Sequence, residues 1–295
     1  KSDFDCTKPL FFIENVNDVT TQQPNPLNIV VHFIKNGNYD YGVPTKKSKV
    51  GKLKDGTRDE KFRKKIKDEL NMILPYVKSK RIVGIDAASS ELFCRPETFG
   101  HVFRYACTQG IQGKTFHAGE DFLDLPDGLR AIDEAMLFLQ LDSKCRIGHA
   151  MALGIDAKAY YERRHYTTII TMQNMLDNCV WLYMRSKELN VTLSPTIMFA
   201  ILEKTKELYS KIGYSVIWDI QCYWHSMLLR GNDPQYIGNQ SNQQLYGMNL
   251  WDRTAEVNDN RLSAANVDAN AKILYSEYFY NSSIKNQGMQ LIEYK

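Results

Sequence analysis

The sequence lacks the long apolar run that a membrane-spanning helix requires. Hydrophobic residues make up 43% of its 295 positions, but no stretch approaches the roughly 20 consecutive apolar residues that cross a bilayer. The first residues, KSDFDCTKPLFF, also lack the basic, apolar and cleavage zones of a secretory signal peptide. We therefore expect a cytoplasmic protein that has a buried core and no membrane contact.

The sequence also has no dense cysteine framework and no strong excess of one charge. Its six cysteines are scattered without a C-x-x-C pair, which excludes a small disulfide-stapled domain and fits a reducing compartment. Lys and Arg number 37 against 34 Asp and Glu, and this net charge of +3 does not indicate a general nucleic-acid binder.

One segment of the chain is strongly basic, although the chain as a whole is nearly neutral. Residues Lys46 to Lys67 include eleven basic and three acidic side chains, a local charge of +8. Such a segment could attract nucleotide phosphates, RNA or an acidic partner subunit. We favour the simpler interpretation, a solvated loop followed by the polar face of a helix.

The first half of the chain alternates between short β-branched runs and amphipathic segments. This pattern is typical of βαβ units and predicts an α/β fold with a parallel sheet. Periodicity does not say whether that sheet is open or closed. Strands are predicted at 28–35, 81–86, 114–117 and 145–149, and helices at 59–77, 98–110 and 127–141.

The strand pattern fades after about residue 158. We therefore divide the chain into an α/β part, residues 1–157, and a mainly α-helical part, residues 158–295. The segment GMQLIEY near the end of the chain predicts a last strand. Helices are predicted over 160–189, 195–212 and 263–280, with a long loop over 231–260.

The sharpest chemical signal is the tetrapeptide His117-Ala118-Gly119-Glu120, at the end of a predicted strand. In a parallel sheet the carboxyl ends of the strands meet at one edge, where α/β enzymes place catalytic groups. An imidazole and a carboxylate three residues apart can both enter one cleft there, as a metal ligand and a proton carrier. Two other strand ends carry polar groups, at Asp86 to Glu91 and at His149.

These three strand ends resemble the adenosine deaminase family of zinc-dependent (β/α)8-barrel hydrolases. Residues 81–91 look like its fourth strand and following loop, HAGE at 117–120 is identical to its fifth-strand motif, and RIGHA at 146–150 is similar to the sixth-strand GHG. The longer stretch over 117–156, with HFIK upstream, is most similar to the deaminase subunits of bacterial RADAR anti-phage systems.

The resemblance implies roles for four residues. His117 would be a zinc ligand, Glu120 the acid that protonates the purine ring nitrogen, and His149 the group that orients and deprotonates the metal-bound water. The loop at Ser89, where the family has Gly, would offer a backbone N–H to the purine. Zinc suits this chemistry because it lowers the pKa of bound water to about 7, and the acid needs a water-poor pocket.

The resemblance further implies conversion of adenosine or an adenine nucleotide to the inosine form, with adenosine in RNA as another possible substrate. A RADAR-like protein would form a homo-oligomer and work with an ATPase partner subunit in anti-phage defence. The choice between nucleoside, nucleotide and RNA lies in loops that the motifs do not describe.

Part of the family pattern is missing from this sequence. The family takes two zinc ligands from an H-x-H on its first strand and another from an Asp on its eighth, and this sequence contains no H-x-H. Asn232-Asp233-Pro234 is superficially similar to the eighth-strand D-D-P, but we interpret it as a coincidence. The remaining histidines carry no supporting motif and are interpreted as ordinary: His32, His101, His165 and His225.

The simplest account is that these residues cover about strands three to six of such a barrel plus a mainly helical insertion that leads toward a further barrel strand, and that other polypeptide supplies the remaining strands. In that case the isolated 295 residues bind no stoichiometric zinc and deaminate nothing. The alternative is a catalytically silent deaminase-like barrel that serves as an assembly or binding module.

Overall fold

The α/β architecture predicted for the first half is present. The computed structural model describes residues 28–35, 55–78, 81–92, 94–233 and 261–294. It contains a four-stranded parallel sheet whose strands follow one another in chain order. These strands, which confirm the four predicted segments, are β1 (Ile29–Ile34), β2 (Ile82–Ala88), β3 (Gly113–Ala118) and β4 (Arg146–His149).

The three predicted helices of this half are confirmed as well. They are α2 (Glu60–Lys78), α3 (Gly100–Thr108), which follows the short 3-10 helix η2 (Pro96–Thr98), and α4 (Leu125–Phe138). Helix α2 buries the stripe that its sequence spacing predicts: Phe62, Ile66, Leu70 and Ile73. Asp124 caps the beginning of α4, where its side chain accepts a hydrogen bond from the N–H of Leu125.

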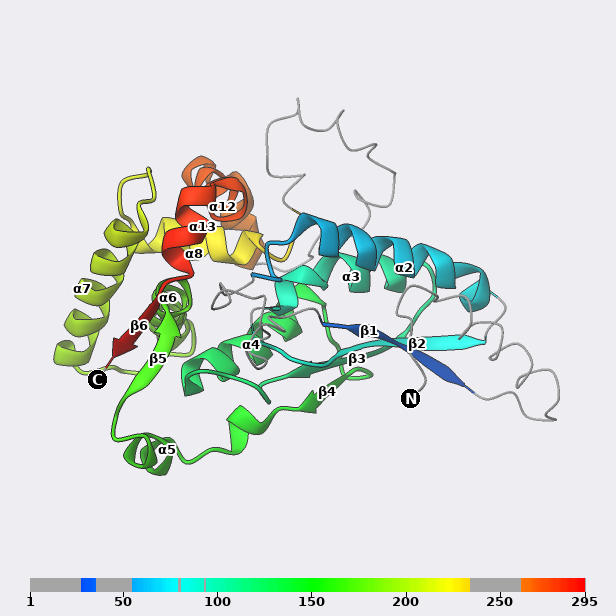
Figure 1. Ribbon diagram of the computed structural model, residues 1–295, viewed down its shortest axis with the longest axis horizontal. Helices are drawn as coiled ribbons and strands as arrows, with labels where there is room; N and C mark the ends of the chain where they lie inside the picture. Colours follow the sequence, from blue (N-terminus) through cyan, green and yellow to red (C-terminus); the bar gives the residue numbers. More distant parts are fainter. Residues whose placement is uncertain (1–27, 36–54, 79–80, 93, 234–260, 295) are drawn as a thin grey trace, which may run out of the picture.

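Helices α2 and α3 lie over one face of the sheet (Figure 1). Right-handed crossovers between parallel strands laid in chain order bring every connecting helix to the same face. Alternate residues of β1 show the consequence, because Phe33 is buried on that face whereas Val30 and Ile34 are 43% and 62% exposed on the other. The four strands are therefore wound in one direction only, without the reversal of order that a doubly wound sheet requires.

The second half is mainly α-helical, as predicted, but it contains a strand inside a predicted helix. Thr168–Thr171 forms β5, and it pairs antiparallel with β6 (Leu291–Tyr294), which corresponds to the predicted last strand. The prediction of continuous helix over 160–189 is wrong at this point, because the run Thr-Thr-Ile-Ile-Thr at 167–171 is β-branched throughout and favours extended backbone.

The other helices of this half are α5 (Ala157–Arg163), α6 (Met172–Glu188), α7 (Pro195–Ile212), α8 (Ile220–Leu229), α11 (Arg261–Val267), α12 (Ala269–Tyr280) and α13 (Ser282–Gly288). The helix predicted over 263–280 is divided at Asp268, which caps α12 by accepting a hydrogen bond from the N–H of Ala271. Nearly all of the predicted loop over 231–260 lies outside the described residues.

The two halves share one hydrophobic core, which extends from Phe33 in β1 to Ile284 in α13. Buried polar contacts of one arginine reinforce the join between them. Arg130 on α4 donates a hydrogen bond to the side chain of Asn178 on α6 and pairs with Asp177 of α6 at 3.6 Å. The helical part is consequently packed onto the α/β part through α4 and α6.

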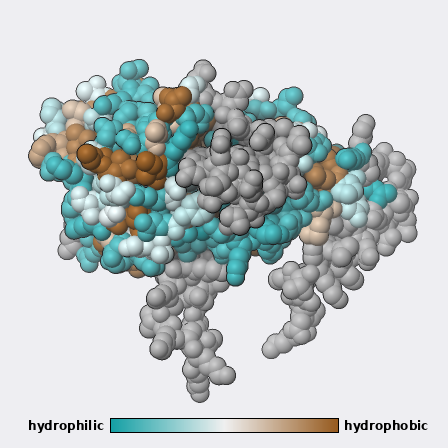
Figure 2. Space-filling model, turned by 90° about the horizontal axis from the view of Figure 1, so that it is seen from above, coloured by the Kyte–Doolittle hydropathy of each residue, from teal (hydrophilic) through white to brown (hydrophobic). Residues whose placement is uncertain are grey.

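The surface of the helical part carries exposed apolar side chains. In the view from above, hydrophobic residues gather over this end of the molecule (Figure 2). Its most exposed large apolar residues include Ile217, Val267 and Phe199.

Across the part of the chain that the structure describes, no helix has both the length and the apolar character needed to cross a membrane.

The described half of the basic segment is mostly engaged within the protein. Arg58 is buried against Asp55 and the ring of Tyr278, and Arg63 is buried and pairs with Glu97. Lys67 pairs with Asp233, and two further lysines form ion pairs along α2. The expected solvated helix face is present at the two exposed lysines. It is wrong for Arg58, Arg63 and Lys67, which are buried or nearly buried in ion pairs. The other five lysines lie outside the described residues: Lys46, Lys47, Lys49, Lys52 and Lys54.

Candidate functional site

The structure brings together three of the residues that the motifs single out. His117 lies at the end of β3, His149 at the end of β4, and Glu120 in the turn between β3 and α4. The ring centroids of the two histidines are 5.2 Å apart, and Nε2 of His149 is 3.3 Å from Oε2 of Glu120. An imidazole, a second imidazole and a carboxylate therefore form one cluster at the carboxyl edge of the sheet.

The cluster is open to solvent among the described residues. The side chain of His117 is 23% exposed, that of Glu120 40% and that of His149 47%. The described residues alone therefore do not form the water-poor pocket that a catalytic acid requires.

The turns around this cluster use backbone that is unusual for residues other than glycine. Ser89, in the loop after β2, has φ of 84°, and His149 and Ala150 have φ of 59° and 48°. A left-handed conformation at a residue with a side chain costs of the order of 1 kcal/mol. At Ser89, the predicted substrate-binding position, the backbone therefore adopts the conformation that the family's glycine would favour. The Ser89 side chain is exposed.

Asp86 holds His117 from the neighbouring strand. Its side chain is 1% exposed, and Oδ1 lies 3.2 Å from Nδ1 of His117. Because Nδ1 faces this carboxylate, Nε2 is the ring nitrogen left to face a ligand. A carboxylate that orients an imidazole in this way is a common arrangement behind histidine ligands and histidine bases.

His32, to which the sequence assigns no role, also lies beside this cluster. On β1 it lies in register with Asp86 of β2, and its Nδ1 is 2.7 Å from Oδ2 of Asp86. The approach is at ion-pair distance, although it is not aligned as a hydrogen bond. Sequence reasoning missed His32 because only the pairing of β1 with β2 places it beside Asp86.

Gly148 makes room for the ring of His117. A Cβ atom at position 148 would lie 2.4 Å from Cδ2 and 2.7 Å from Nε2 of His117. The two residues are paired in register across β3 and β4, so the imidazole lies against the bare backbone of the next strand. This glycine thus determines where the His117 ring lies.

Replacing Gly148 by Ala should force the His117 ring away from β4. We expect the free energy of unfolding to fall by about 1–3 kcal/mol, the usual cost of overpacking, measured by urea titration of tryptophan fluorescence. Gly154→Ala is the matched control, because no atom lies within 4 Å of its Cβ position, and it should change stability by less than about 0.5 kcal/mol. Equal effects of the two variants would contradict this explanation.

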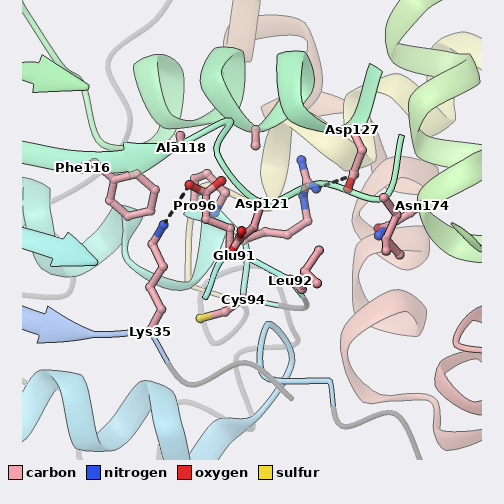
Figure 3. A pocket seen from close by; sticks show the side chains of 13 residues that line it. Lys35, Glu91, Leu92, Cys94, Pro96, Phe116, Ala118, Asp121, Asp127 and Asn174 are labelled. Carbon is pink, nitrogen blue, oxygen red and sulfur yellow. Dashed lines mark hydrogen bonds and ion pairs between the residues drawn. The ribbon is translucent and has the colours of Figure 1, made fainter. Parts of the chain in front are cut away.

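A buried pair, Lys35 and Glu91, lies beneath the turn that carries Glu120. Figure 3 shows Lys35 reaching from the end of β1 toward Glu91, with the ring of Phe116 beside it. Burial lowers the pKa of Lys35 and raises that of Glu91, and in each case the partner's charge opposes the shift. Both residues line a small cavity of about 10 Å³, which has room for about one water molecule.

The described residues do not form a complete zinc site. All six histidines lie in the described ranges, yet the described residues contain no group of three or more His, Cys, Asp or Glu side chains that could hold a metal ion. A catalytic zinc usually has three protein ligands. The predicted ligand His117 is therefore only one member of the set that a zinc site needs.

Asp233 and the remaining histidines take part in other contacts. Asp233 contacts Lys67 on α2 and His101 on α3. Burial alone would raise the pKa of Asp233, but the neighbouring His101 and the charge of Lys67 outweigh it and hold that pKa well below its usual range. His225 pairs with Asp268, the cap of α12, and His165 occupies a left-handed turn after α5.

Comparison with known proteins adds no family assignment. A scan of the sequence against protein-family models found no match, and a search of curated proteins found no match. The interpretation of the site therefore depends on its motifs and its geometry.

Proposed function

We propose that this chain forms about strands three to six of a (β/α)8 barrel that hydrolytically deaminates adenosine or an adenine nucleotide with the help of zinc. The observation that carries the proposal is the convergence of His117, Glu120 and His149 at the carboxyl edge of the sheet. These are the residues to which the resemblance assigns a metal ligand, an acid and a base. Their convergence supports those assignments independently of the sequence motifs.

The winding of the sheet also supports the proposal. Four parallel strands in chain order, with helices over one face, are the repeating unit of a (β/α)8 barrel. The opposite face carries His32, Asp86 and His117, together with the small residues Gly84 and Gly148. In a closed barrel this face would point inward.

Each residue of the cluster has a chemical role in the proposal. Glu120 donates a proton to the purine ring nitrogen as water adds to the ring, and His149, 3.3 Å away, orients the attacking water. Asp86 holds the ring of His117, so that Nε2 faces the ligand. The remaining zinc ligands would come from polypeptide outside the described residues.

A second candidate is a catalytically silent barrel that serves as an assembly or binding module. The absence of a three-donor group among the described residues favours it. The exposed Phe199, Ile217 and Val267 suit contacts with other subunits, and they equally support the homo-oligomer expected of the enzyme.

Metal analysis combined with an inosine assay separates the two candidates. For the deaminase we expect about one zinc per chain and inosine formation in the complete protein, and neither in the isolated 295 residues. Free adenosine, ATP and an RNA oligonucleotide would serve as parallel substrates. A complete protein that holds no metal and converts none of the three would support the module, and turnover by the isolated residues would refute the assignment to part of a barrel.

A further inference from the structure

Three successive strand ends meet at one buried ion pair. Lys35 follows β1, Glu91 follows β2, and the turn 117–120 begins with the last two residues of β3. The Lys35 ammonium lies 4.0 Å from Oε1 of Glu91, and it also donates a hydrogen bond to the backbone carbonyl of His117. Both side chains are almost fully buried, with exposures of 1% and 6%.

The side chain of Glu91 binds the backbone of the turn 117–120. Its carboxylate accepts hydrogen bonds from two successive backbone N–H groups, those of Gly119 at 2.7 Å and Glu120 at 3.3 Å. Gly119 has φ of 76°, and a Cβ there would lie 2.6 Å from Ile132 of α4, so the turn is pressed against that helix. The backbone between His117 and Glu120 is thus bound on one side by Glu91 and on the other by α4.

Lys35 completes this arrangement. It binds the carbonyl of His117 and balances the charge of Glu91, while its ammonium lies 4.3 Å from the centroid of the Phe116 ring. A buried carboxylate without a compensating cation is strongly destabilising. The pair therefore contacts the turn at three backbone groups: the carbonyl of 117 and the N–H groups of 119 and 120.

We propose that Lys35 and Glu91 are positioning residues, which fix the turn 117–120 and thereby set the distance between the His117 imidazole and the Glu120 carboxylate. The hydrogen bonds of the pair to the turn are made to backbone groups, so the pair acts on the turn and not through a substrate. The expected change in kcat rests on the proposed deaminase function, whereas the expected change in the hydrogen exchange of residues 117–122 does not.

The test replaces Lys35 by Met, which is of similar length but uncharged, in the complete protein. We expect the amide hydrogens of the peptide 117–122 to exchange at least about 10-fold faster, measured by hydrogen–deuterium exchange and mass spectrometry. We also expect kcat for adenosine to fall about 10- to 100-fold with KM nearly unchanged, because displacing a catalytic group by about 1 Å costs this much. Lys35→Arg, which retains the charge, should recover part of both losses.

Lys67→Met is the matched control. It also removes a lysine from a buried pair, with Asp233, but that pair joins α2 to the segment that follows α8. It should leave the exchange of 117–122 and kcat unchanged. If both lysine variants alter these quantities equally, the effect is a general loss of stability and the proposal is overturned.

A double variant tests the proposal even if the single Lys35→Met variant does not fold. Lys35→Met combined with Glu91→Gln removes both charges at once, so no uncompensated buried charge remains. It should fold and still show faster exchange over 117–122. Unchanged exchange in this variant would overturn the positioning role. A wild-type protein that converts no adenosine would instead count against the proposed function, and the exchange measurement would still decide the role of the pair.

Discussion

Replacing Glu120 by Gln should lower kcat for adenosine deamination by about 10²- to 10⁴-fold, the usual contribution of a general acid. Glutamine keeps the size and the oxygen of the side chain, and it can still approach Nε2 of His149, which lies 3.3 Å from Oε2 of Glu120. It cannot deliver a carboxylic acid proton to the purine ring. The measurement is steady-state inosine formation by the complete protein, with zinc content determined in parallel.

Zinc content should not change in this variant, because the proposal assigns the metal to His117 and not to Glu120. Glu162→Gln provides the control. This glutamate on α5 is 50% exposed and forms a surface pair with Lys158, so its loss should leave kcat within twofold of the wild-type value. Full activity in the Glu120 variant would remove Glu120 from the role of acid, and loss of zinc would show that it binds the metal instead.

The free energy of unfolding should fall by about 3 kcal/mol as the pH rises from about 4.5 to 8, through the ionisation of Glu97. Burial raises the pKa of this carboxyl from 4.5 to about 7, despite the nearby guanidinium groups of Arg230 and Arg63. Oε2 has no hydrogen-bond partner among the described residues, so its charged form is poorly solvated. Oε1 accepts hydrogen bonds from the hydroxyl of Tyr278 and from Nη2 of Arg63.

The sign follows from the two pKa values. The unfolded chain loses this proton near pH 4.5, whereas the folded chain keeps it until about pH 7. The contribution to stability is therefore complete below pH 4.5, declines as the pH rises, and is lost once the pH has passed about 7. Urea unfolding followed by tryptophan fluorescence at a series of pH values measures this decline.

Other groups titrate in the same pH range. The contribution of Glu97 is therefore obtained by comparing the pH dependence of stability between variants. Burial also raises the pKa of Glu91 and lowers that of His101, and these two shifts act in opposite directions on stability. Glu97→Gln should remove about 3 kcal/mol of the wild-type change, whereas Glu162→Gln should keep it all. If Glu97→Gln has the same pH dependence as the wild type, Glu97 is not protonated in the folded protein at neutral pH.

The accuracy of the predictions from sequence depended on how local each signal was. The strands at 28–35 and 114–117 and the helix at 59–77 were found because short strand-like runs and the period-3.6 pattern depend only on neighbouring residues. The helix predicted over 160–189 failed at β5, where antiparallel pairing with a strand more than 100 residues later stabilises the extended backbone of Thr168–Thr171.

The residues of the candidate site also differ in whether a local pattern in the sequence identifies them. HAGE at 117–120 and the histidine at 149 were recognisable because each motif lies at one strand end. His32 and Lys35 carried no local signal, since their partners Asp86 and Glu91 lie on the next strand and its loop, more than 50 residues away. Only the register of β1 against β2 places these pairs together.

The sequence by itself determined the alternation of strands and helices, the side chains available at each strand end, and the glycine at 148 that leaves space for an imidazole. The tertiary structure decided which of those side chains meet. It placed Asp86 between His32 and His117 and put a buried ion pair beneath the turn at 117–120. The physical reason is that a residue's own pattern specifies which face of a strand it occupies, whereas its partner depends on strand order and register, which arise from packing across the whole core.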